Sequence, residues 1–142
     1  MASESENIQA VLRGYEALNR GDVDAAGANL ADDFEFSLPP MLPDHEEHSS
    51  GAESFKRTWL AWRDQFEDFR LDVEEVLDAG DGRVLVMAAT CGTGKGSRLE
   101  VRSPSFAQIW TLRAGVAVSM ISLPNRATAM GALGRGPKID WE

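Results

Sequence analysis

Residues 50–91 read SGAESFKRTWLAWRDQFEDFRLDVEEVLDAGDGRVLVMAATC, and the hydrophobic period changes within this stretch. In its first part, aromatic side chains recur at i, i+4, i+7 and i+11, namely at Phe55, Trp59, Trp62 and Phe66. This spacing places them along one side of a helix. Ser50 and Glu53 have the spacing of a capping box at the start of that helix. The stretch therefore begins with a predicted helix that has one aromatic face.

From Phe69 onward, apolar and charged residues alternate, which is the period of a strand with one buried face. Gly80-Asp81-Gly82 predicts a turn. Val84–Cys91 is apolar at nearly every position, as expected of a central strand that is covered on both faces. The second part therefore predicts an antiparallel pair of strands that follows the aromatic helix.

The residues before this stretch predict two helices and a short strand. An amphipathic helix is expected over 8–19, and a shorter helix over 23–30 with Asp22 as its N-cap. A strand is expected over 34–38, where aromatic and aliphatic residues alternate with polar ones. The three prolines in 39–50 predict a loop.

The residues after it predict hairpins and a last helix. Their expected elements are a turn at 92–96, a strand region over 99–113 that bends at Pro104, a hairpin turn at Ala114-Gly115, a strand over 116–123, a short helix over 126–133 and a tail over 134–142. Strands and helices do not alternate as in βαβ units, so the fold class is α+β. A length of 142 residues predicts a single domain over 1–142.

Composition and charge exclude several classes of protein. The formal net charge of −9 disfavours binding to nucleic acid, because phosphate backbones are repelled. The longest apolar stretch is Val84–Ala89, which is far shorter than the ~20 residues of a membrane-spanning helix. The N-terminal MASESENIQA lacks a secretory signal, so we expect a cytoplasmic location and no membrane partner. A single cysteine, Cys91, allows no internal disulfide and is interpreted as a small core residue.

Four segments resemble the nuclear transport factor 2-like superfamily, and within it the SnoaL-like group. They are YEALNRGD at 15–22 with LADD at 30–33, FEDFRL at 66–71, FAQIWTLR at 106–113 with VAVSM at 116–120, and RATAMGALG at 126–134. The resemblance covers about residues 7–133. It implies a cone in which three N-terminal helices pack on a strongly curved, mixed or antiparallel sheet, with a short C-terminal helix. It also implies a pocket at the wide end and a homodimer formed through the outer sheet face, in line with the two apolar faces of Val84–Cys91.

The resemblance does not extend to the catalytic residues of the ketosteroid isomerases. Those relatives use a carboxylate base and an oxyanion hole formed by a tyrosine and a protonated aspartate. Aligned on the flanking motifs, the tyrosine position falls at Gly14, the base at Leu38 and the aspartate at Ala107. Tyr15 is one residue further on, which is ~100° of rotation around a helix. Gln108, next to Ala107, does not transfer protons. We therefore do not expect ketosteroid isomerase chemistry.

Other groups of polar residues have a structural interpretation beside a functional one. The loop Asp44-His45-Glu46-Glu47-His48 holds both histidines, and it is either a solvated loop, a lid over a ligand, or a site of proton transfer or metal binding. Asp72, Glu74 and Arg102 could activate a water, but their alternation predicts a solvated edge of the sheet. The GTGKGS segment at 92–97 is followed by a strand, so it is a hairpin turn and not a phosphate-binding loop.

The pocket implied by the resemblance is mostly apolar. Its expected lining combines helix and strand residues: Tyr15, Leu38, Phe55, Trp59, Ala107, Ile109, Met120 and Ser122. Such a lining suits a small hydrophobic molecule, with Tyr15 and Ser122 as hydrogen-bonding groups. We expect no cofactor and no metal. Three functions stay open: a protein that binds a small molecule without chemistry, an isomerase, cyclase or dehydratase that uses Tyr15, Asp44, His45 or His48, and a regulatory dimer with a vestigial cavity.

Overall fold

A computed structural model describes residues 4–37 and 49–134. The helices are α1 (Glu4–Asn19), α2 (Val23–Gly27), α3 (Ala52–Arg63) and α4 (Arg126–Gly134). The strands are β1 (Leu30–Phe36), β2 (Ser49–Ser50), β3 (Phe66–Gly80), β4 (Arg83–Gly94), β5 (Glu100–Arg102), β6 (Phe106–Arg113) and β7 (Val116–Leu123). The chain is an α+β protein, as the sequence predicts.

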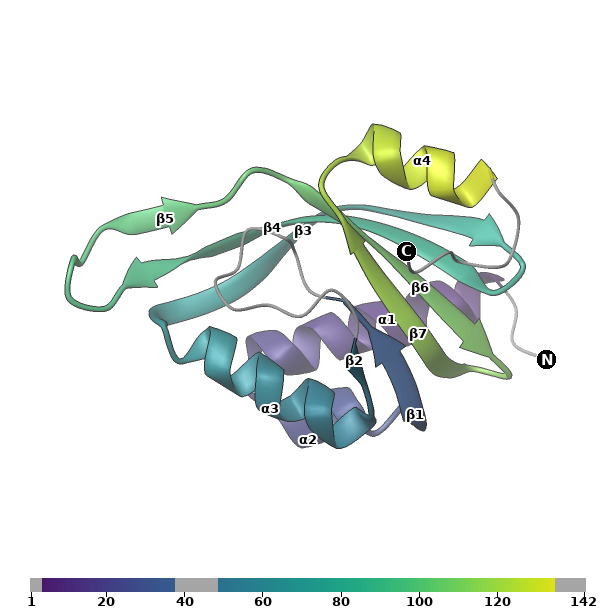
Figure 1. The fold of residues 1–142 in the computed structure, drawn as a ribbon, viewed down its shortest axis with the longest axis horizontal. Coiled ribbons are helices and arrows are strands. Elements are labelled where there is room, and N and C mark those ends of the chain that lie inside the picture. The colour runs from purple at the N-terminus through teal and green to yellow at the C-terminus, as the bar shows by residue number, and fades with distance from the viewer. Residues whose placement is uncertain (1–3, 38–48, 135–142) are drawn as a thin grey trace.

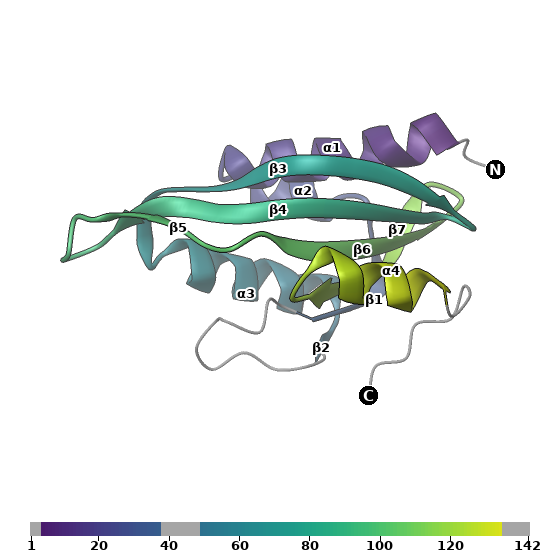
Figure 2. The ribbon, with the colours of Figure 1, turned by 90° about the horizontal axis from the view of Figure 1, so that it is seen from above.

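One mixed sheet of seven strands forms the centre of the molecule, in the order β2-β1-β7-β6-β4-β3, with β5 paired to β4. β1 runs parallel to β7, and the other paired strands are antiparallel. The helices α1, α2 and α3 lie on one face of the curved sheet, and α4 lies on the other (Figure 1). Viewed from the α4 side, α4 lies across β6 and β7 (Figure 2). This arrangement matches the expected cone.

Two short hairpin turns set the register of the long strands. Asp81 and Gly82 join β3 to β4, and Ala114 and Gly115 join β6 to β7. All four residues have positive φ, between 52° and 80°. Turns with positive φ at both central residues match the right-handed twist of the flanking strands. Both turns lie where the sequence predicts them.

Asn19, the last residue of α1, fixes that helix to the sheet. Its side-chain amide donates to the carbonyl of Leu71 (2.9 Å) and its side-chain oxygen accepts from the Leu71 amide (2.8 Å). These two bonds tie the end of α1 to an inner position of β3. They hold the inward side of α1, which includes Tyr15, against the concave face of the sheet.

The buried residues form two clusters on opposite faces of the sheet. The inner cluster joins α1 and α3 to the sheet and includes Phe34, Phe55 and Trp59. The outer cluster lies under α4 and joins Leu85, Met87, Ala107, Ile109 and Ile121 to Ala129 and Ala132. β4 therefore has two apolar faces because α4 covers the outer one.

The structure corrects several predicted boundaries. The helix predicted over 23–30 ends at Gly27, because Leu30 already pairs with Ala117 of β7. Asp22 is its N-cap as predicted, and its side chain accepts from the Ala25 amide (3.1 Å). The capping box predicted from Ser50 and Glu53 at the start of α3 is wrong, because Ser50 is not the N-cap of that helix.

Ser50 belongs to β2, where it pairs with Glu35. The N-cap of α3 is Gly51, which has φ 102° and no capping side chain. The predicted turn at 92–96 starts later, because β4 continues to Gly94. The predicted loop over 39–50 is wrong at its end, because residues 49–50 form β2, and the predicted tail starts one residue later, because α4 ends at Gly134. Leu38, residues 39–48 and residues 135–142 lie outside the described residues.

Candidate functional site

A chain of hydrogen bonds crosses the inner cluster, where most neighbours are apolar. The indole N–H of Trp110 donates to the Tyr15 hydroxyl (2.8 Å), which donates to the side-chain oxygen of Gln108. The Gln108 amide donates to Ser122 Oγ (3.1 Å), which donates to the carbonyl of Ser37 (2.8 Å). These five residues are all buried. We call them the polar chain.

Three elements hold the polar chain in place. Tyr15 is on α1, Gln108 and Trp110 are two residues apart on β6, and Ser122 is on β7 directly opposite Gln108. Residues at i and i+2 of a strand share a face, so Gln108 and Trp110 both face α1. The Ser122 amide also donates to Ser37 Oγ (2.9 Å), which fixes the residue that follows β1.

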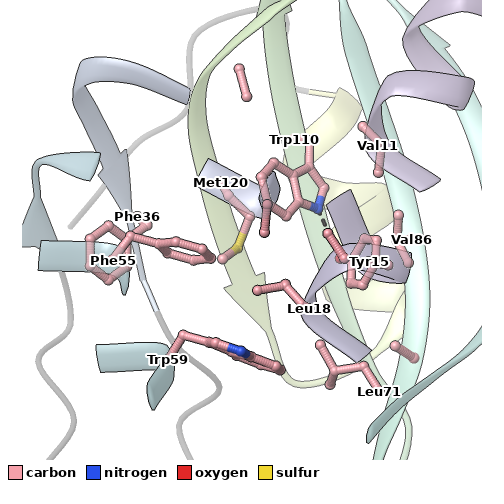
Figure 3. Close-up of a cluster of buried hydrophobic side chains, with 14 of the residues drawn as sticks. Val11, Tyr15, Leu18, Phe36, Phe55, Trp59, Leu71, Val86, Trp110 and Met120 are labelled. Atoms are coloured by element: carbon pink, nitrogen blue, oxygen red, sulfur yellow. Dashed lines mark hydrogen bonds between the residues drawn. The ribbon is translucent and has the colours of Figure 1, made fainter. Parts of the chain in front are cut away.

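Aromatic rings line the inner cluster beside the polar chain. Phe34 stacks on Trp110, with ring centroids 5.8 Å apart, and meets Phe55 edge-to-face at 5.5 Å. Phe36 also meets Phe55 edge-to-face at 5.2 Å. Figure 3 shows Phe36, Phe55 and Trp59 on one side of Met120 and Leu18, with Tyr15 and Val86 on the other. The polar chain is therefore embedded in an apolar, largely aromatic environment.

The indoles of Trp59 and Trp62 and one side-chain N–H of Gln108 have no hydrogen-bond partner among the described residues, and Trp59 and Gln108 concern the site. Trp59 is only 2% exposed, and its indole Nε1 makes no hydrogen bond. Gln108 has two side-chain N–H groups, of which Ser122 accepts one. A buried donor without a partner costs about 1–3 kcal/mol. Each of the two groups is a donor, so a ligand atom that pairs with either one must be a hydrogen-bond acceptor.

The Tyr15 hydroxyl is held in its neutral form. Burial raises the pKa of this phenol well above its usual range, and the bond from Trp110 offsets that rise in part. Tyr15 therefore acts as a hydrogen-bond donor at neutral pH and not as a base. The buried polar and charged residues of the described chain include no carboxylate and no histidine. The described part of the site can orient an oxygen atom but lacks a proton acceptor.

The structure brings together five of the eight residues predicted to line the pocket. They are Tyr15, Phe55, Trp59, Met120 and Ser122, and the first four belong to the inner cluster. Ala107 and Ile109 lie instead in the outer cluster, under α4. Their expected inward orientation is wrong, because Gln108 and Trp110 occupy the inward positions of β6.

The other site residues predicted from the sequence lie outside the part of the chain that the structure describes. Leu38, Asp44, His45 and His48 fall within 38–48 and are outside the described residues. Ser37, the last member of the polar chain, directly precedes this segment in sequence. The roles predicted for these four residues stay predictions.

Tyr15 and Gln108 also correct the alignment on the ketosteroid isomerase residues. That alignment points to Gly14 and Ala107, but the inward residues are the next ones along the chain at both places. Gly14 lies in α1 with open space where a side chain would begin. Because the hydroxyl of Tyr15 bonds to Gln108, a tyrosine does face the interior from α1, paired with an amide instead of a carboxylic acid.

Ser37, Trp110 and the role of Gln108 are not among the site residues predicted from the sequence. The period-two pattern of 106–113 could have placed Gln108 and Trp110 on one face. It could not say which face is the inner one, because both faces of β6 are apolar. Nothing in the sequence marks Ser37 as a partner of Ser122, since their pairing depends on the contact between β1 and β7.

Asp72, Glu74 and Arg102 form a charged cluster on the outer face. Arg102 donates to Asp72 Oδ2 (2.8 Å) and to Glu74 Oε2 (2.6 Å), and Ser105 donates to Glu74 Oε1 (2.5 Å). The ion-paired side chains are 33–49% exposed. These residues do converge, but at the surface, so the prediction of a solvated edge is confirmed.

Within 4–37 and 49–134, no group of three or more histidine, cysteine, aspartate or glutamate residues is placed to hold a metal ion. No helix in these ranges is long and apolar enough to cross a membrane.

Solved structures with the same fold are similar to this chain at low sequence identity. Bal32a, from a soil-derived mobile gene cassette, has a TM-score of 0.72 and 20% identity, over 84% of this chain and 90% of that one. An NTF2-like protein of unknown function from Burkholderia pseudomallei has a TM-score of 0.69 and 22% identity, over 92% of this chain and 97% of that one. SalBIII is an epoxide hydrolase/cyclase-like enzyme with a role in pyran ring formation in the polyether salinomycin. It has a TM-score of 0.72 and 18% identity, over 89% of this chain and 96% of that one.

At these identities the similarity establishes the fold alone. No curated protein matches the chain. The model of the SnoaL-like domain family matches residues 11–120, which is more than half of the chain. That span contains α1 from Val11 onward, the sheet up to Met120 and four of the five residues of the polar chain. The protein therefore belongs to the SnoaL-like domain family.

Proposed function

We propose that this protein binds a small, largely apolar molecule that carries a hydrogen-bond-accepting oxygen, such as a ketone or quinone carbonyl, inside the cone. The observation that carries the proposal is the unpaired indole N–H of Trp59 together with the free N–H of Gln108. A carbonyl oxygen bound there satisfies donors that otherwise stay buried without a partner. The surrounding rings of Phe36 and Phe55 suit an aromatic or alicyclic body.

A matched pair of ligands tests the proposal directly. Acetylnaphthalene and ethylnaphthalene have similar size, but only the first carries a carbonyl oxygen. We expect the ketone to raise the midpoint of thermal unfolding and to bind more tightly, by about two- to tenfold, the range for one hydrogen bond. Equal binding of the two ligands, or no binding of either to the folded protein, would overturn the proposal.

Two tryptophan variants supply the matched control. Trp59→Phe removes the unpaired N–H that faces Met120 and Leu18, and it should abolish the preference for the ketone (Figure 3). Trp62→Phe makes the same chemical change one turn further along α3, where Trp62 Nε1 is also buried without a partner and the ring packs on Phe69. The preference for the ketone should survive in Trp62→Phe. Loss of the preference in both variants would assign it to general packing and not to the Trp59 donor.

A second candidate is an isomerase, cyclase or dehydratase. It is favoured by the position of Ser37, because the polar chain ends at the residue directly before 38–48, which holds Asp44, His45 and His48. In this function the Tyr15 hydroxyl gives up its bond to Gln108 and donates to the carbonyl oxygen, and one of the three residues removes a proton from the neighbouring carbon. Exchange of the methyl protons of acetylnaphthalene in deuterated water, followed by NMR, tests it. Exchange that persists in the triple Asp44→Asn, His45→Gln, His48→Gln variant would exclude these bases.

The proposal includes a cytoplasmic homodimer that pairs through the outer sheet face. Leu77 at the end of β3 and Met130 on α4 are 37% and 41% exposed. Light scattering on the unmodified chain and on a Leu77→Lys, Met130→Lys variant measures the mass. A monomeric mass for the unmodified chain would rule out the dimer without affecting the ligand site.

A further inference from the structure

A groove that meets the polar chain only at Trp110 lies between α1, α2 and the β6–β7 hairpin. Its volume is about 440 Å³, within the range of small-molecule pockets. Apolar side chains line its inner part, among them Val11, Leu112 and Ala117. Trp110 and Phe55 also line it, and like Val11, Leu112 and Ala117 they belong to the inner cluster, so the groove borders that cluster. We call this cavity the helix groove.

The rim of the helix groove carries two free cationic side chains. Arg13 on α1 and Arg20, the residue directly after α1, both line it, seven residues apart in sequence. The Arg20 amide still donates to the Glu16 carbonyl (3.1 Å), which continues the helical turn and keeps the two side chains on one side. Neither side chain has an ion-pair or hydrogen-bond partner among the described residues. Glu16 lies between them and also lines the groove, so the rim has one net positive charge. The whole chain has a net charge of −9, so this rim departs from the rest of the surface.

Gly14 leaves the mouth of the groove open. It lines the groove, and a Cβ built at this position meets no atom within 4 Å. α1 could therefore hold a larger residue at position 14 without strain, and such a residue would fill the groove. The volume, the apolar inner part and the charged rim together describe a site for a ligand with an apolar body and an anionic end.

We propose that the helix groove is a second binding site, for a small amphipathic carboxylate whose apolar body lies against Trp110 and Phe55 and whose carboxylate meets Arg13 or Arg20. This site does not depend on the proposed function, because it uses none of the free donors at Trp59 and Gln108. The two sites share the rings of Phe55 and Trp110, which both line the groove, and the Trp110 N–H bonds to Tyr15.

Octanoate and octanol are the probes that test this second site. They have the same apolar body, and only octanoate is charged. Backbone amide shifts on the unmodified chain map where each one binds. We expect saturable octanoate shifts at Gly14, Ala28 and Ala117, and tighter binding of octanoate than of octanol. Shifts centred on Phe36 and Ser122, or no saturable shifts, would overturn the inference and leave the ketone test of the inner site unaffected.

Variants at position 14 and at the two rim arginines test which groups of the helix groove bind octanoate. Gly14→Phe should weaken octanoate binding at least about tenfold by filling the groove. Gly131→Phe is the matched control, because Gly131 is also a helical glycine with nothing within 4 Å of its Cβ position, on α4. Arg13→Gln with Arg20→Gln should weaken octanoate by about two- to fivefold and leave octanol unchanged, as expected for exposed charges. An unchanged octanoate affinity in the arginine variant, or an equal loss in both glycine variants, would contradict the assignment.

Discussion

The two faces of the sheet are both buried, but they are built differently. On the outer face, β4, β6 and β7 present the aliphatic outer cluster to α4, and buried Arg83 donates to the carbonyl of Leu133 at the end of that helix (3.2 Å). On the inner face, the same strands present aromatic rings and the polar chain to α1 and α3. A stable core needs no buried polar groups, and each one without a partner lowers stability. The proposed ligand site is placed on the inner face for this reason, whereas the outer cluster packs α4 on the sheet.

The largest expected effect is a loss of stability when a side chain is removed from the outer cluster. Ile109→Ala removes a fully buried side chain from beneath α4 and should lower the free energy of unfolding by about 2–5 kcal/mol. The ketone preference should persist in this variant, because Ile109 points away from the polar chain. Chemical denaturation and ligand titration on the same sample measure the two quantities. A lost preference in folded protein would mean that the two faces are not independent.

A smaller stability loss with a larger functional loss is expected on the inner face. Gln108→Met keeps the length of the side chain but leaves the Tyr15 hydroxyl without its acceptor and Ser122 without its donor. It should lower the free energy of unfolding by about 1–3 kcal/mol, the cost of unpaired buried polar groups. Ketone and ethyl ligands should then bind equally. Met87→Leu on the outer face is the control for a change of similar volume, with less than about 1.5 kcal/mol lost.

At alkaline pH, the buried phenol of Tyr15 should make stability depend on pH through the inner face of the sheet. Tyr15 is the only tyrosine of the chain, and burial raises its pKa in the folded state. Below the ordinary tyrosine pKa of about 10, both states keep the proton, so the group adds no pH dependence. At higher pH only the unfolded state releases it, and the free energy of unfolding should fall by up to about 1.4 kcal/mol per pH unit.

Two measurements check this expectation. The phenolate absorbance of the native protein should stay absent until the chain unfolds. In Tyr15→Phe the part of the alkaline slope that comes from the phenol should disappear, although the variant is less stable at every pH. The ordinary pKa of a tyrosine is about 10. If the native protein formed phenolate near this pH, Tyr15 would be in contact with solvent, which would contradict the prediction.

The smallest effect is expected in the charged cluster of the outer face. Bonds from Ser105 and Arg102 hold the pKa of Glu74 below its ordinary value. A carboxyl group with a lowered folded pKa stabilises the protein above its unfolded pKa, and this contribution disappears as the pH falls. Glu74→Gln should therefore change stability little at neutral pH and make its decline below about pH 4.5 slightly less steep. A large loss at neutral pH would contradict the surface role of this cluster.

Local sequence determined most of the secondary structure. The aromatic spacing from Phe55 to Trp62 places these residues on the buried side of α3, and the alternation after Phe69 produces β3. The hairpin turns at 81–82 and 114–115 follow from residues that tolerate positive φ. The prediction failed at Leu30 and Ser50, because both residues belong to strands whose pairing partners lie far away or in another element. Local preferences carry no information about such partners.

The site depended on the tertiary structure. Hydrophobic periodicity alone predicts that a tyrosine lies on an amphipathic helix and that β6 has two apolar faces. Only the packing of α1 and α4 on opposite sides of the sheet decided that Gln108 and Trp110 face inward while Ala107 and Ile109 face outward. The physical reason is that a strand with two apolar faces satisfies the hydrophobic effect in either orientation, so contacts between distant segments must choose one. The same contacts formed the polar chain and left the Trp59 N–H without a partner.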